Sequence, residues 1–234
     1  MKTKIINTPD LKKAASSKSN GTVFETLAKD YVDELKKLAN GKSYYIRTYG
    51  CQANVRDEET MRGLLENIGY LPASEPEEAD VIIINTCAVR ENAEDKVYGE
   101  IGNLKYLRKK NKNLVLAICG CMVEQPEILK RLMDKFPEVN LYFGTHEIHH
   151  LYQLIFETMT KGERIVSIES KAGEVVEELP VCRNNRFKAF VNIIYGCNKF
   201  CTYCIVPYTR GRERSREKDD ILNEVKELVA KGYK

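Results

Sequence analysis

The sequence predicts an α/β protein, in which a parallel β-sheet covered by helices is followed by the beginning of a second α/β unit. From residue 43 onwards, short apolar segments alternate with longer segments of helical pattern, which is the order typical of a parallel sheet. The run at residues 81–84, Val-Ile-Ile-Ile, is continuously apolar, as in a strand that is covered on both faces. After a polar stretch that contains Pro180, a further strand-like segment begins at Phe187. Together these observations predict two units joined by a linker.

The elements of the first unit follow from the spacing of apolar residues, which recur at helical intervals between the expected strands. The strands are predicted at residues 43–49, 81–85, 114–119, 141–143 and 165–168. The helices are predicted at residues 57–68, 93–109, 125–135 and 147–159. We therefore place a parallel-sheet domain at residues 42–168. An extension at residues 1–41 precedes it, partly disordered and with one amphipathic helix near residues 24–38.

The second unit offers too little chain for a core of its own. Residues 169–186 form a predicted linker, after which we expect a strand at 187–195 and a helix at 218–230. One strand and one helix do not close a hydrophobic core. Residues 187–234 are therefore predicted to be the truncated start of a domain. The chain is accordingly expected to be the N-terminal part of a longer protein and to be inactive by itself.

Composition and charge narrow the class of protein. Of the 234 residues, 43% are hydrophobic and 30% are charged, which suits a globular domain with a polar surface. No apolar run approaches the roughly 20 residues that span a bilayer, and the first residues lack the apolar segment of a secretory signal. We therefore expect a monomer in the cytoplasm without membrane contact. Residues 183–234 hold 12 Lys and Arg against 6 Asp and Glu, which weakly favours a polyanionic partner.

Eight cysteines are the most informative residues of the chain. In a reducing cytosol they are not expected to form structural disulfides, which leaves metal ligands, reactive thiols and small core residues. Cys197, Cys201 and Cys204 have the spacing C-x3-C-x2-C, and thiolates are the natural ligands of iron–sulfur clusters. Because a cubane cluster normally has one ligand on each iron, three cysteines leave one iron open for a substrate. A zinc site is the alternative, but it needs a fourth ligand, and no histidine lies between Cys197 and Lys234.

Three further cysteines share a position in the predicted fold. Cys51, Cys87 and Cys121 each follow a predicted strand, and the two gaps between them suit one strand–helix–strand unit each. Parallel strands place their carboxyl ends at one edge of the sheet, where open α/β folds bind ligands, so the three thiols can converge there. The alternative is that each is a small buried residue at a strand end. Cys119 and Cys182 are interpreted as non-ligands, with Cys119 the more plausible substitute.

The triplet and its surroundings resemble the radical S-adenosylmethionine superfamily. The triplet follows the first strand of a predicted domain, and an aromatic residue, Tyr203, precedes its last cysteine. The resemblance implies a partial (β/α) barrel, a 4Fe–4S cluster on Cys197, Cys201 and Cys204, and S-adenosylmethionine chelated by the open iron. It also implies that Tyr203 packs near the adenine. A 5′-deoxyadenosyl radical would then attack a C–H bond that no side-chain base can deprotonate.

The N-terminal blocks narrow the resemblance to the methylthiotransferases. These blocks read Tyr-Gly-Cys-Gln-Ala-Asn at 49–54, Asn-Thr-Cys-Ala-Val-Arg-Glu-Asn-Ala-Glu at 85–94 and Cys-Gly-Cys at 119–121. The resemblance implies a second 4Fe–4S cluster on Cys51, Cys87 and Cys121. It implies transfer of a methylthio group to C2 of N6-isopentenyladenosine next to the tRNA anticodon. The implied partners are tRNA, S-adenosylmethionine and an electron donor such as flavodoxin or ferredoxin.

Two other classes of function stay open at this point. One is a methylthiotransferase that acts on threonylcarbamoyl-adenosine in tRNA or on a ribosomal protein. The other is an iron–sulfur electron-transfer module without catalysis, which would not cleave S-adenosylmethionine.

Two sets of basic residues also stand out. An alternating set follows the triplet, namely Arg210, Arg212, Arg214 and Arg216. The block that contains these arginines resembles the methylthiotransferases. The arginines are expected either to be a solvated charged stretch or to contact S-adenosylmethionine or RNA phosphate. Three histidines stand at a predicted helix start, namely His146, His149 and His150. No pattern of cysteines or carboxylates accompanies them, and they are interpreted as surface residues.

Overall fold

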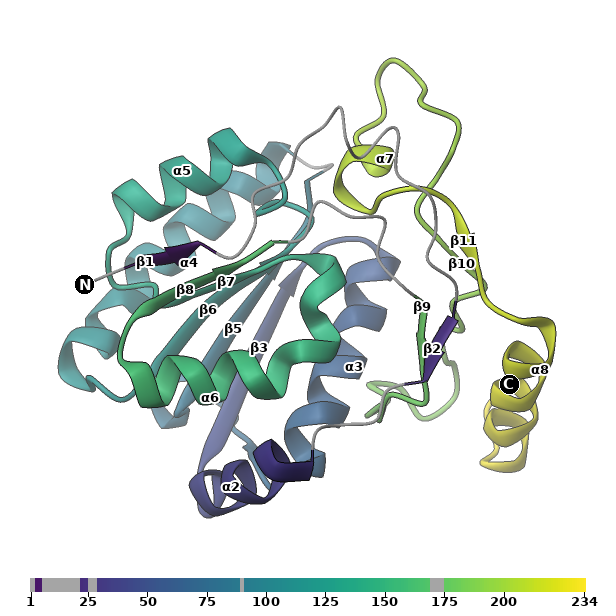
Figure 1. Ribbon diagram of the computed structural model, residues 1–234, viewed down its shortest axis with the longest axis horizontal. Helices are drawn as coiled ribbons and strands as arrows, with labels where there is room; N and C mark the ends of the chain where they lie inside the picture. The colour runs from purple at the N-terminus through teal and green to yellow at the C-terminus, as the bar shows by residue number, and fades with distance from the viewer. Residues whose placement is uncertain (1–2, 6–21, 25–28, 89–90, 169–174) are drawn as a thin grey trace.

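The computed structural model describes residues 3–5, 22–24, 29–88, 91–168 and 175–234, with a sheet at its centre (Figure 1). This sheet has seven strands in the order β1-β8-β7-β6-β5-β3-β4, and every neighbouring pair is parallel. The strands are Thr3–Ile5 (β1), Ser43–Tyr49 (β3), Leu71–Pro72 (β4), Val81–Thr86 (β5), Val115–Gly120 (β6), Leu141–Phe143 (β7) and Arg164–Ser167 (β8). The predicted α/β class with a parallel sheet is confirmed.

Helices cover both faces of the sheet, as Figure 1 shows. On one face lie α2 (Lys29–Ala39), α3 (Gln52–Asn67) and α6 (Leu151–Lys161), and on the other lie α4 (Glu91–Lys110) and α5 (Pro126–Lys135). Side chains alternate along a strand, so Ile83 enters the core on the first face and Ile82 the core on the second. All six residues of β5 are therefore buried. Among the described residues, no helix combines the length and the hydrophobicity that crossing a bilayer requires.

The order of the strands reverses beside β3. The chain passes from β3 through α3 to β4 at one edge, and then returns to the other side of β3 to form β5 and the strands beyond it. Because α3 and α4 lie on opposite faces, the carboxyl ends of β3 and β5 flank the point where open α/β sheets bind ligands. Cys51 and Cys87 follow these two strands.

The predicted elements of the sheet domain agree closely with the observed ones. The strands at 43–49 and 141–143 have the predicted bounds, and the others are shifted by one residue at one end or both. The helix predicted at 57–68 begins earlier, because Cys51 occupies its N-cap and Asn54 accepts a hydrogen bond from the Cys51 amide. The helix predicted at 147–159 consists of a 3₁₀ turn, Thr145–His150 (η2), followed by α6.

The N-terminal extension and the linker contribute strands that the sequence did not predict. β1 extends the sheet beside β8, and β2 (Thr22–Phe24) pairs in parallel with β9 (Val175–Glu177) in a separate sheet. The predicted amphipathic helix corresponds to α2. Residues 6–21 and 25–28 of the extension, including its predicted disorder, and residues 169–174 of the linker lie outside the described residues.

The second unit consists of a small hairpin and a helix. β10 (Ile194–Tyr195) pairs antiparallel with β11 (Arg214–Ser215), and the loop between them carries the cysteine triplet and α7 (Val206–Thr209). α8 (Lys218–Ala230) has the predicted bounds. The strand predicted at 187–195 is wrong in length, since only its last two residues form a strand. Among the described residues, no strand pairs with residues 187–193.

Candidate functional site

The three N-terminal cysteines lie side by side at the carboxyl edge of the sheet. Thr86 in β5 is the register partner of the last residue of each neighbouring strand, Tyr49 in β3 and Gly120 in β6. The cysteines follow these three residues by one or two positions, as Cys51, Cys87 and Cys121. Their predicted position at three neighbouring strand ends is confirmed, and their role as ligands stays a prediction.

Two buried asparagines hold the ends of β3 and β5 together. Through its side-chain amide, Asn54 donates to Oδ1 of Asn85 at 3.2 Å and to the Thr86 carbonyl at 3.0 Å. Asn85 donates in return to the Asn54 carbonyl at 2.8 Å. Both belong to motif blocks to which the sequence analysis gave no individual role. The available signal was a polar side chain at the end of a strand that is otherwise buried and apolar, because such a group needs hydrogen-bond partners.

Cys51 and Cys87 contact each other. Cys87 is buried, and Cys51 is partly buried at the N-terminus of α3. A hydrogen bond with Cys87 lowers the pKa of Cys51 to about 5, although burial acts in the opposite direction. The amides of the first helical turn and the charge of Arg210 lower this pKa as well. These contacts favour the thiolate of Cys51, which is the form in which cysteine binds metals.

Cys121 follows a turn that requires glycine. Gly120 has a φ of +96°, and a Cβ at this position would collide with the Thr86 carbonyl oxygen. The Cys121 amide donates to the same oxygen at 2.9 Å. Burial raises the pKa of Cys121, whereas the nearby guanidinium of Arg210 lowers it. Nε of Arg210 donates to Sγ of Cys121 at 3.1 Å.

The other two cysteines of this part of the chain occupy different environments. Cys119 is buried in the core beside α3, where its Sγ lies 3.8 Å from Sδ of Met61. Burial raises the pKa of Cys119 well above its usual value. This geometry favours the interpretation of Cys119 as a core thiol over that of a substitute ligand. Cys182 is partly buried in the linker, and burial and Glu66 raise its pKa.

The C-terminal triplet lies on the loop between β10 and β11. Cys197 and Cys204 are partly buried and Cys201 is exposed. The Cys197 amide donates to the Gly211 carbonyl at 3.1 Å. Gly196 has a φ of +69°, and a Cβ there would collide with the same carbonyl oxygen. The start of the loop is therefore packed tightly against the segment that leads into β11.

Tyr203, expected near the adenine, is 91% exposed. Its neighbours in the loop make the aromatic contacts instead: Phe200 and Tyr208 meet edge to face at 5.9 Å between ring centroids, and the Arg212 guanidinium lies 5.3 Å from the Phe200 centroid. An exposed aromatic ring beside three thiols is free to pack against a ligand. Its assignment to cofactor binding stays a prediction.

The donor atoms at both places suit iron–sulfur chemistry. Within the described ranges, no group of three or more His, Cys, Asp or Glu side chains is close enough to hold a metal ion. Each set nevertheless offers only thiols, the soft ligands that select iron–sulfur clusters, zinc or copper over magnesium or calcium. Gly120 and Gly196 each allow a turn at positive φ directly before a cysteine, where a side chain would collide with backbone. The residues present thus fit such a group.

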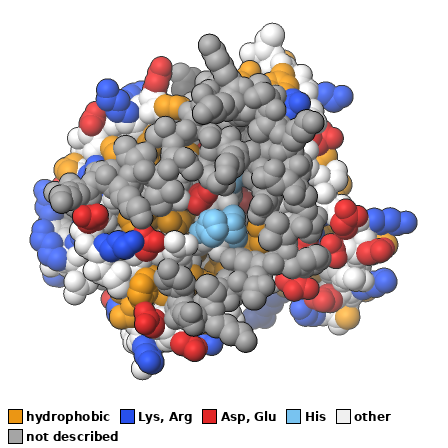
Figure 2. All heavy atoms as spheres, in the orientation of Figure 1, with side chains coloured by type: hydrophobic (Ala, Val, Ile, Leu, Met, Phe, Trp, Pro, Cys, Tyr) orange, Lys and Arg blue, Asp and Glu red, His pale blue; other side chains and the backbone are white. Residues whose placement is uncertain are grey.

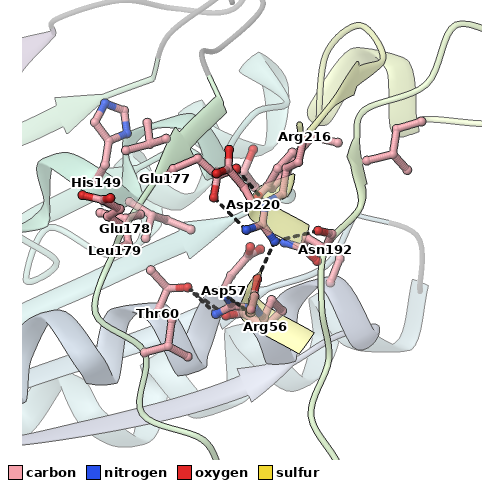
Figure 3. A pocket seen from close by; sticks show the side chains of 18 of the residues that line it. Arg56, Asp57, Thr60, His149, Glu177, Glu178, Leu179, Asn192, Arg216 and Asp220 are labelled. Atoms are coloured by element: carbon pink, nitrogen blue, oxygen red, sulfur yellow. Dashed lines mark hydrogen bonds and ion pairs between the residues drawn. The ribbon is translucent and has the colours of Figure 1, made fainter. Parts of the chain in front are cut away.

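A polar cavity of about 850 Å³ lies between the sheet domain and the second unit. Its walls come from α3, η2, the linker, the triplet loop and α8. Figure 3 shows Arg216 directed at Glu177 on one side and Arg56 bonded to Thr60 on the other. Arg216 also donates to the Asn192 carbonyl at 2.9 Å. Ion pairs and hydrogen bonds therefore connect the walls of the cavity.

The interpretation of the histidines as surface residues is wrong for two of them. His146 and His149 line the cavity, and only His150 is exposed. Burial lowers the pKa of His146 to about 3 and that of His149 to about 4, so both rings are neutral at neutral pH. Nδ1 of His146 accepts a hydrogen bond from Arg214 at 3.3 Å. Histidine side chains are in view near the middle of the face in Figure 2, and His149 borders the cavity in Figure 3.

The arginines after the triplet are not a solvated stretch. Arg214 is 5% exposed, and the side chains of Arg210 and Arg216 are 15% and 7% exposed. Arg210 pairs with Asp57 of α3 at 2.6 Å. Asp57 could not be singled out from the sequence, because nothing in its local pattern separates it from the other charged residues of that helix.

Comparison with known families identifies both parts of the chain. The family described as "Uncharacterized protein family UPF0004" matches residues 43–144, and the "Radical SAM superfamily" matches residues 191–234. Membership of the radical SAM superfamily implies an iron–sulfur cluster and the use of S-adenosylmethionine.

Curated relatives match nearly the whole chain. Those from Geobacillus kaustophilus (strain HTA426) and Bacillus subtilis (strain 168) are each 48% identical, over 99% and 97% of this chain and 44% of their own length. One from Bacillus licheniformis is 51% identical over 86% of this chain and 40% of its own length. All three are described as tRNA-2-methylthio-N(6)-dimethylallyladenosine synthase. The chain therefore spans less than half the length of these relatives.

Solved structures add no further argument. A ligand-free aspartate transcarbamoylase from Trypanosoma cruzi is 12% identical, over 66% of this chain and 71% of its own, with a TM-score of 0.18. The assignment rests on the sequence relatives and on the order of the two matched families. At this level of identity, the chain belongs to the radical S-adenosylmethionine methylthiotransferase family.

Proposed function

We propose that this chain is the N-terminal part of an enzyme that adds a methylthio group to C2 of N6-isopentenyladenosine next to the anticodon of tRNA. The relatives, 48% to 51% identical, carry the name of that activity. The observation that carries the proposal is the contact between Arg210 and Cys121 at 3.1 Å. Because Arg210 belongs to the triplet loop, this contact supports an arrangement in which the two cysteine sets serve one reaction.

The cofactors of the proposal are two 4Fe–4S clusters and S-adenosylmethionine. Cys51, Cys87 and Cys121 would hold one cluster, and Cys197, Cys201 and Cys204 would hold the other. When bound, these groups supply a radical able to remove hydrogen from C2, where a general base cannot act, and the sulfur of the methylthio group. Tyr203 would pack against the adenine of S-adenosylmethionine.

The described residues contribute position and surroundings to this chemistry. Asn54 and Asn85 fix the strand ends that carry Cys51 and Cys87. The cavity behind the triplet loop has charged walls, and the ion pair of Arg56 with Glu224 joins α3 to α8 of the second unit. The site is thus built between two units, as ligand sites often are.

The proposal also includes the partners of the protein and its division into domains. The partners are tRNA, S-adenosylmethionine and an electron donor such as flavodoxin or ferredoxin, with a monomeric protein in the cytoplasm. The proposed division is an extension at 1–41, a sheet domain at 42–168, a linker at 169–186 and the start of a radical domain at 187–234. The excess of Lys and Arg in residues 183–234 supports a polyanionic partner near the second unit.

The experiment separates the two cysteine sets in the full-length enzyme. Replacing Cys51, Cys87 and Cys121 together with Ala should abolish methylthiolation and preserve reductive formation of 5′-deoxyadenosine. Replacing the triplet should abolish both products. Methylthiolation and 5′-deoxyadenosine formation are both measured, on tRNA that carries N6-isopentenyladenosine and on tRNA that carries threonylcarbamoyl-adenosine.

The control for this experiment is Cys119→Ala, which removes a core thiol two residues before Cys121. Methylthio product from the N-terminal triple variant would show that this set is structural and that the proposal is wrong. Turnover of the threonylcarbamoyl substrate in preference to the isopentenyl substrate would contradict the substrate assignment.

A further inference from the structure

Arg210 stands on the backbone segment that anchors the triplet loop. Its amide donates to the Val206 carbonyl at 2.8 Å, which ends α7. The next residue, Gly211, has a φ of +72° and accepts the hydrogen bond from the Cys197 amide at 3.1 Å. The position of Arg210 is therefore fixed one residue away from the backbone partner of the first triplet cysteine.

The side chain of Arg210 leaves its own unit and reaches the N-terminal cysteine set. Nε donates to Sγ of Cys121 at 3.1 Å, and Nη2 donates to Oδ2 of Asp57 at 2.6 Å. Asp57 lies on α3, whose N-cap is Cys51. The side chains of Arg210 and Asp57 are 15% and 10% exposed, so this pair is largely removed from water. A guanidinium that is fixed in this way by a carboxylate has little freedom to turn away from the sulfur.

Arg210 has two side-chain acceptors, Asp57 and Cys121. Burial by itself would lower the pKa of Arg210, but Asp57 and Cys121 raise it above its usual value. Burial raises the pKa of Glu124 to about 8, so this nearby carboxyl is mostly protonated at neutral pH. His146 is neutral. The guanidinium is thus directed at one carboxylate and one cysteine sulfur.

We propose that Arg210 is a positioning residue of the N-terminal cysteine set. It belongs to the triplet loop and is held by Asp57, and it donates a charge-assisted hydrogen bond to the sulfur of Cys121 while that sulfur ligates a cluster. The inference rests on the proposed function for one point, the cluster on Cys51, Cys87 and Cys121. A cationic donor on a ligand sulfur stabilises the more negative, reduced form of a cluster, and hydrogen bonds to sulfur are among the factors that set its potential. The loop that carries one cysteine set thereby tunes the other.

The test isolates the N-terminal cluster and measures its reduction potential. The parent is the full-length enzyme with Cys197, Cys201 and Cys204 replaced by Ala, reconstituted anaerobically with iron and sulfide. In this background, Arg210→Gln should decrease the equilibrium constant for reduction by about tenfold, which is about 59 mV for a one-electron couple. Arg210→Lys, which keeps the charge, should lie between Arg210→Gln and the parent.

The matched control is Arg212→Gln, on the same loop, whose guanidinium lies over Phe200 instead of a cysteine. It should leave the potential of the parent unchanged. Equal potentials for the parent and Arg210→Gln would overturn the proposal, and so would an equal shift in Arg212→Gln. If Arg210→Gln keeps the far-ultraviolet circular dichroism of the parent but loses its iron, while Arg210→Lys retains iron, the result supports the same role.

The proposed function and the role of Arg210 fail in different ways. A parent without bound iron refutes the N-terminal cluster itself and, with it, the inference about Arg210. A parent that binds iron with a potential unaffected by Arg210→Gln refutes only the inference. A purely structural role would appear as loss of stability with an unchanged potential.

Discussion

Arg216 binds Glu177 through two parallel hydrogen bonds, from Nε to Oε1 at 2.6 Å and from Nη2 to Oε2 at 2.7 Å. Glu177 ends the linker strand β9, and Arg216 follows β11 of the hairpin, so the pair joins the linker to the second unit. Glu224 of α8 accepts further hydrogen bonds from Arg216, Arg183 and Arg56. Since Arg56 lies on α3, this network joins the sheet domain to the linker and the second unit.

Removing Arg216 should therefore destabilise the protein strongly. Both side chains of its pair with Glu177 are only 7% exposed, and Arg216→Met removes both of the hydrogen bonds that Arg216 donates to Glu177. Breaking a buried ion pair from one side costs about 3–5 kcal/mol, and the loss is measured as the change in free energy of unfolding by urea. Lys231→Met is the control, because its pair with Glu227 spans 3.9 Å and is 68% and 72% exposed. A similarly small loss in both variants would contradict a structural role for the network.

Gly120→Ala should be far more harmful than Gly69→Ala. The two glycines have similar backbone conformations, with φ of +96° and +100°. A Cβ at Gly69 meets nothing within 4 Å, so its cost is the backbone strain of about 1–3 kcal/mol. A Cβ at Gly120 also collides with the Thr86 carbonyl, and it should displace Cys121 and lower the iron bound by the N-terminal set. Urea unfolding and iron analysis measure both effects, and equal losses in the two variants would refute the close approach.

Glu124 should make stability depend on pH. Burial raises the pKa of this carboxyl from an ordinary 4.5 to about 8. The folded protein therefore retains a proton that the unfolded chain has lost, so this contribution is full below about pH 4.5 and is lost as the pH rises through about 8. Glu124→Gln keeps an acceptor for the Thr145 amide. Between about pH 4.5 and 8, this variant should lose roughly 1.4 kcal/mol less unfolding free energy per pH unit than the parent.

Urea unfolding at a series of pH values measures this difference between the parent and Glu124→Gln. Glu127→Gln removes an exposed carboxyl at the start of α5 and serves as the control. Parallel profiles for the parent and Glu124→Gln would show that Glu124 is ionised in the folded protein and that the sign is wrong.

Replacing Cys197, Cys201 and Cys204 with Ala should remove one cluster from the full-length enzyme. All cleavage of S-adenosylmethionine should be lost with it, while the N-terminal set keeps its iron. Iron and sulfide analysis of anaerobic protein measures the first effect, and formation of 5′-deoxyadenosine measures the second. Cys182→Ala should change neither, and an unchanged iron content in the triple variant would contradict the assignment.

The parts of the fold that depend on local pattern could be predicted from the sequence. The strand predicted at 81–85 was evident from its apolar run, and the strand-end positions of Cys51, Cys87 and Cys121 followed from the parallel topology. The pairing of β2 with β9 could not be predicted, because each strand has three residues and the two are far apart in the chain. The strand expected at 187–195 failed for a related reason, since a strand needs a partner that periodicity does not reveal.

In the site, too, residues in local motifs could be predicted from the sequence, whereas contacts between distant residues could not. Six cysteines were recognisable by spacing and by motif, whereas the contact between Arg210 and Cys121 joins residues 89 positions apart. The charge alternation of the arginine block left its exposure open, because the sequence does not show which carboxylates face it. Burial of His146 and His149 likewise depends on the second unit folding back over η2.

The register that aligns Tyr49, Thr86 and Gly120 in one row also restricts how the chain can vary in length. Side chains alternate along a strand, so inserting or deleting one residue near the end of β5 would turn Cys87 toward the opposite face. The turn at residues 111–114 joins α4 to the start of β6, at the opposite edge of the sheet. Extra residues there leave every cysteine in place, which makes this turn the suitable position for an inserted tag or label.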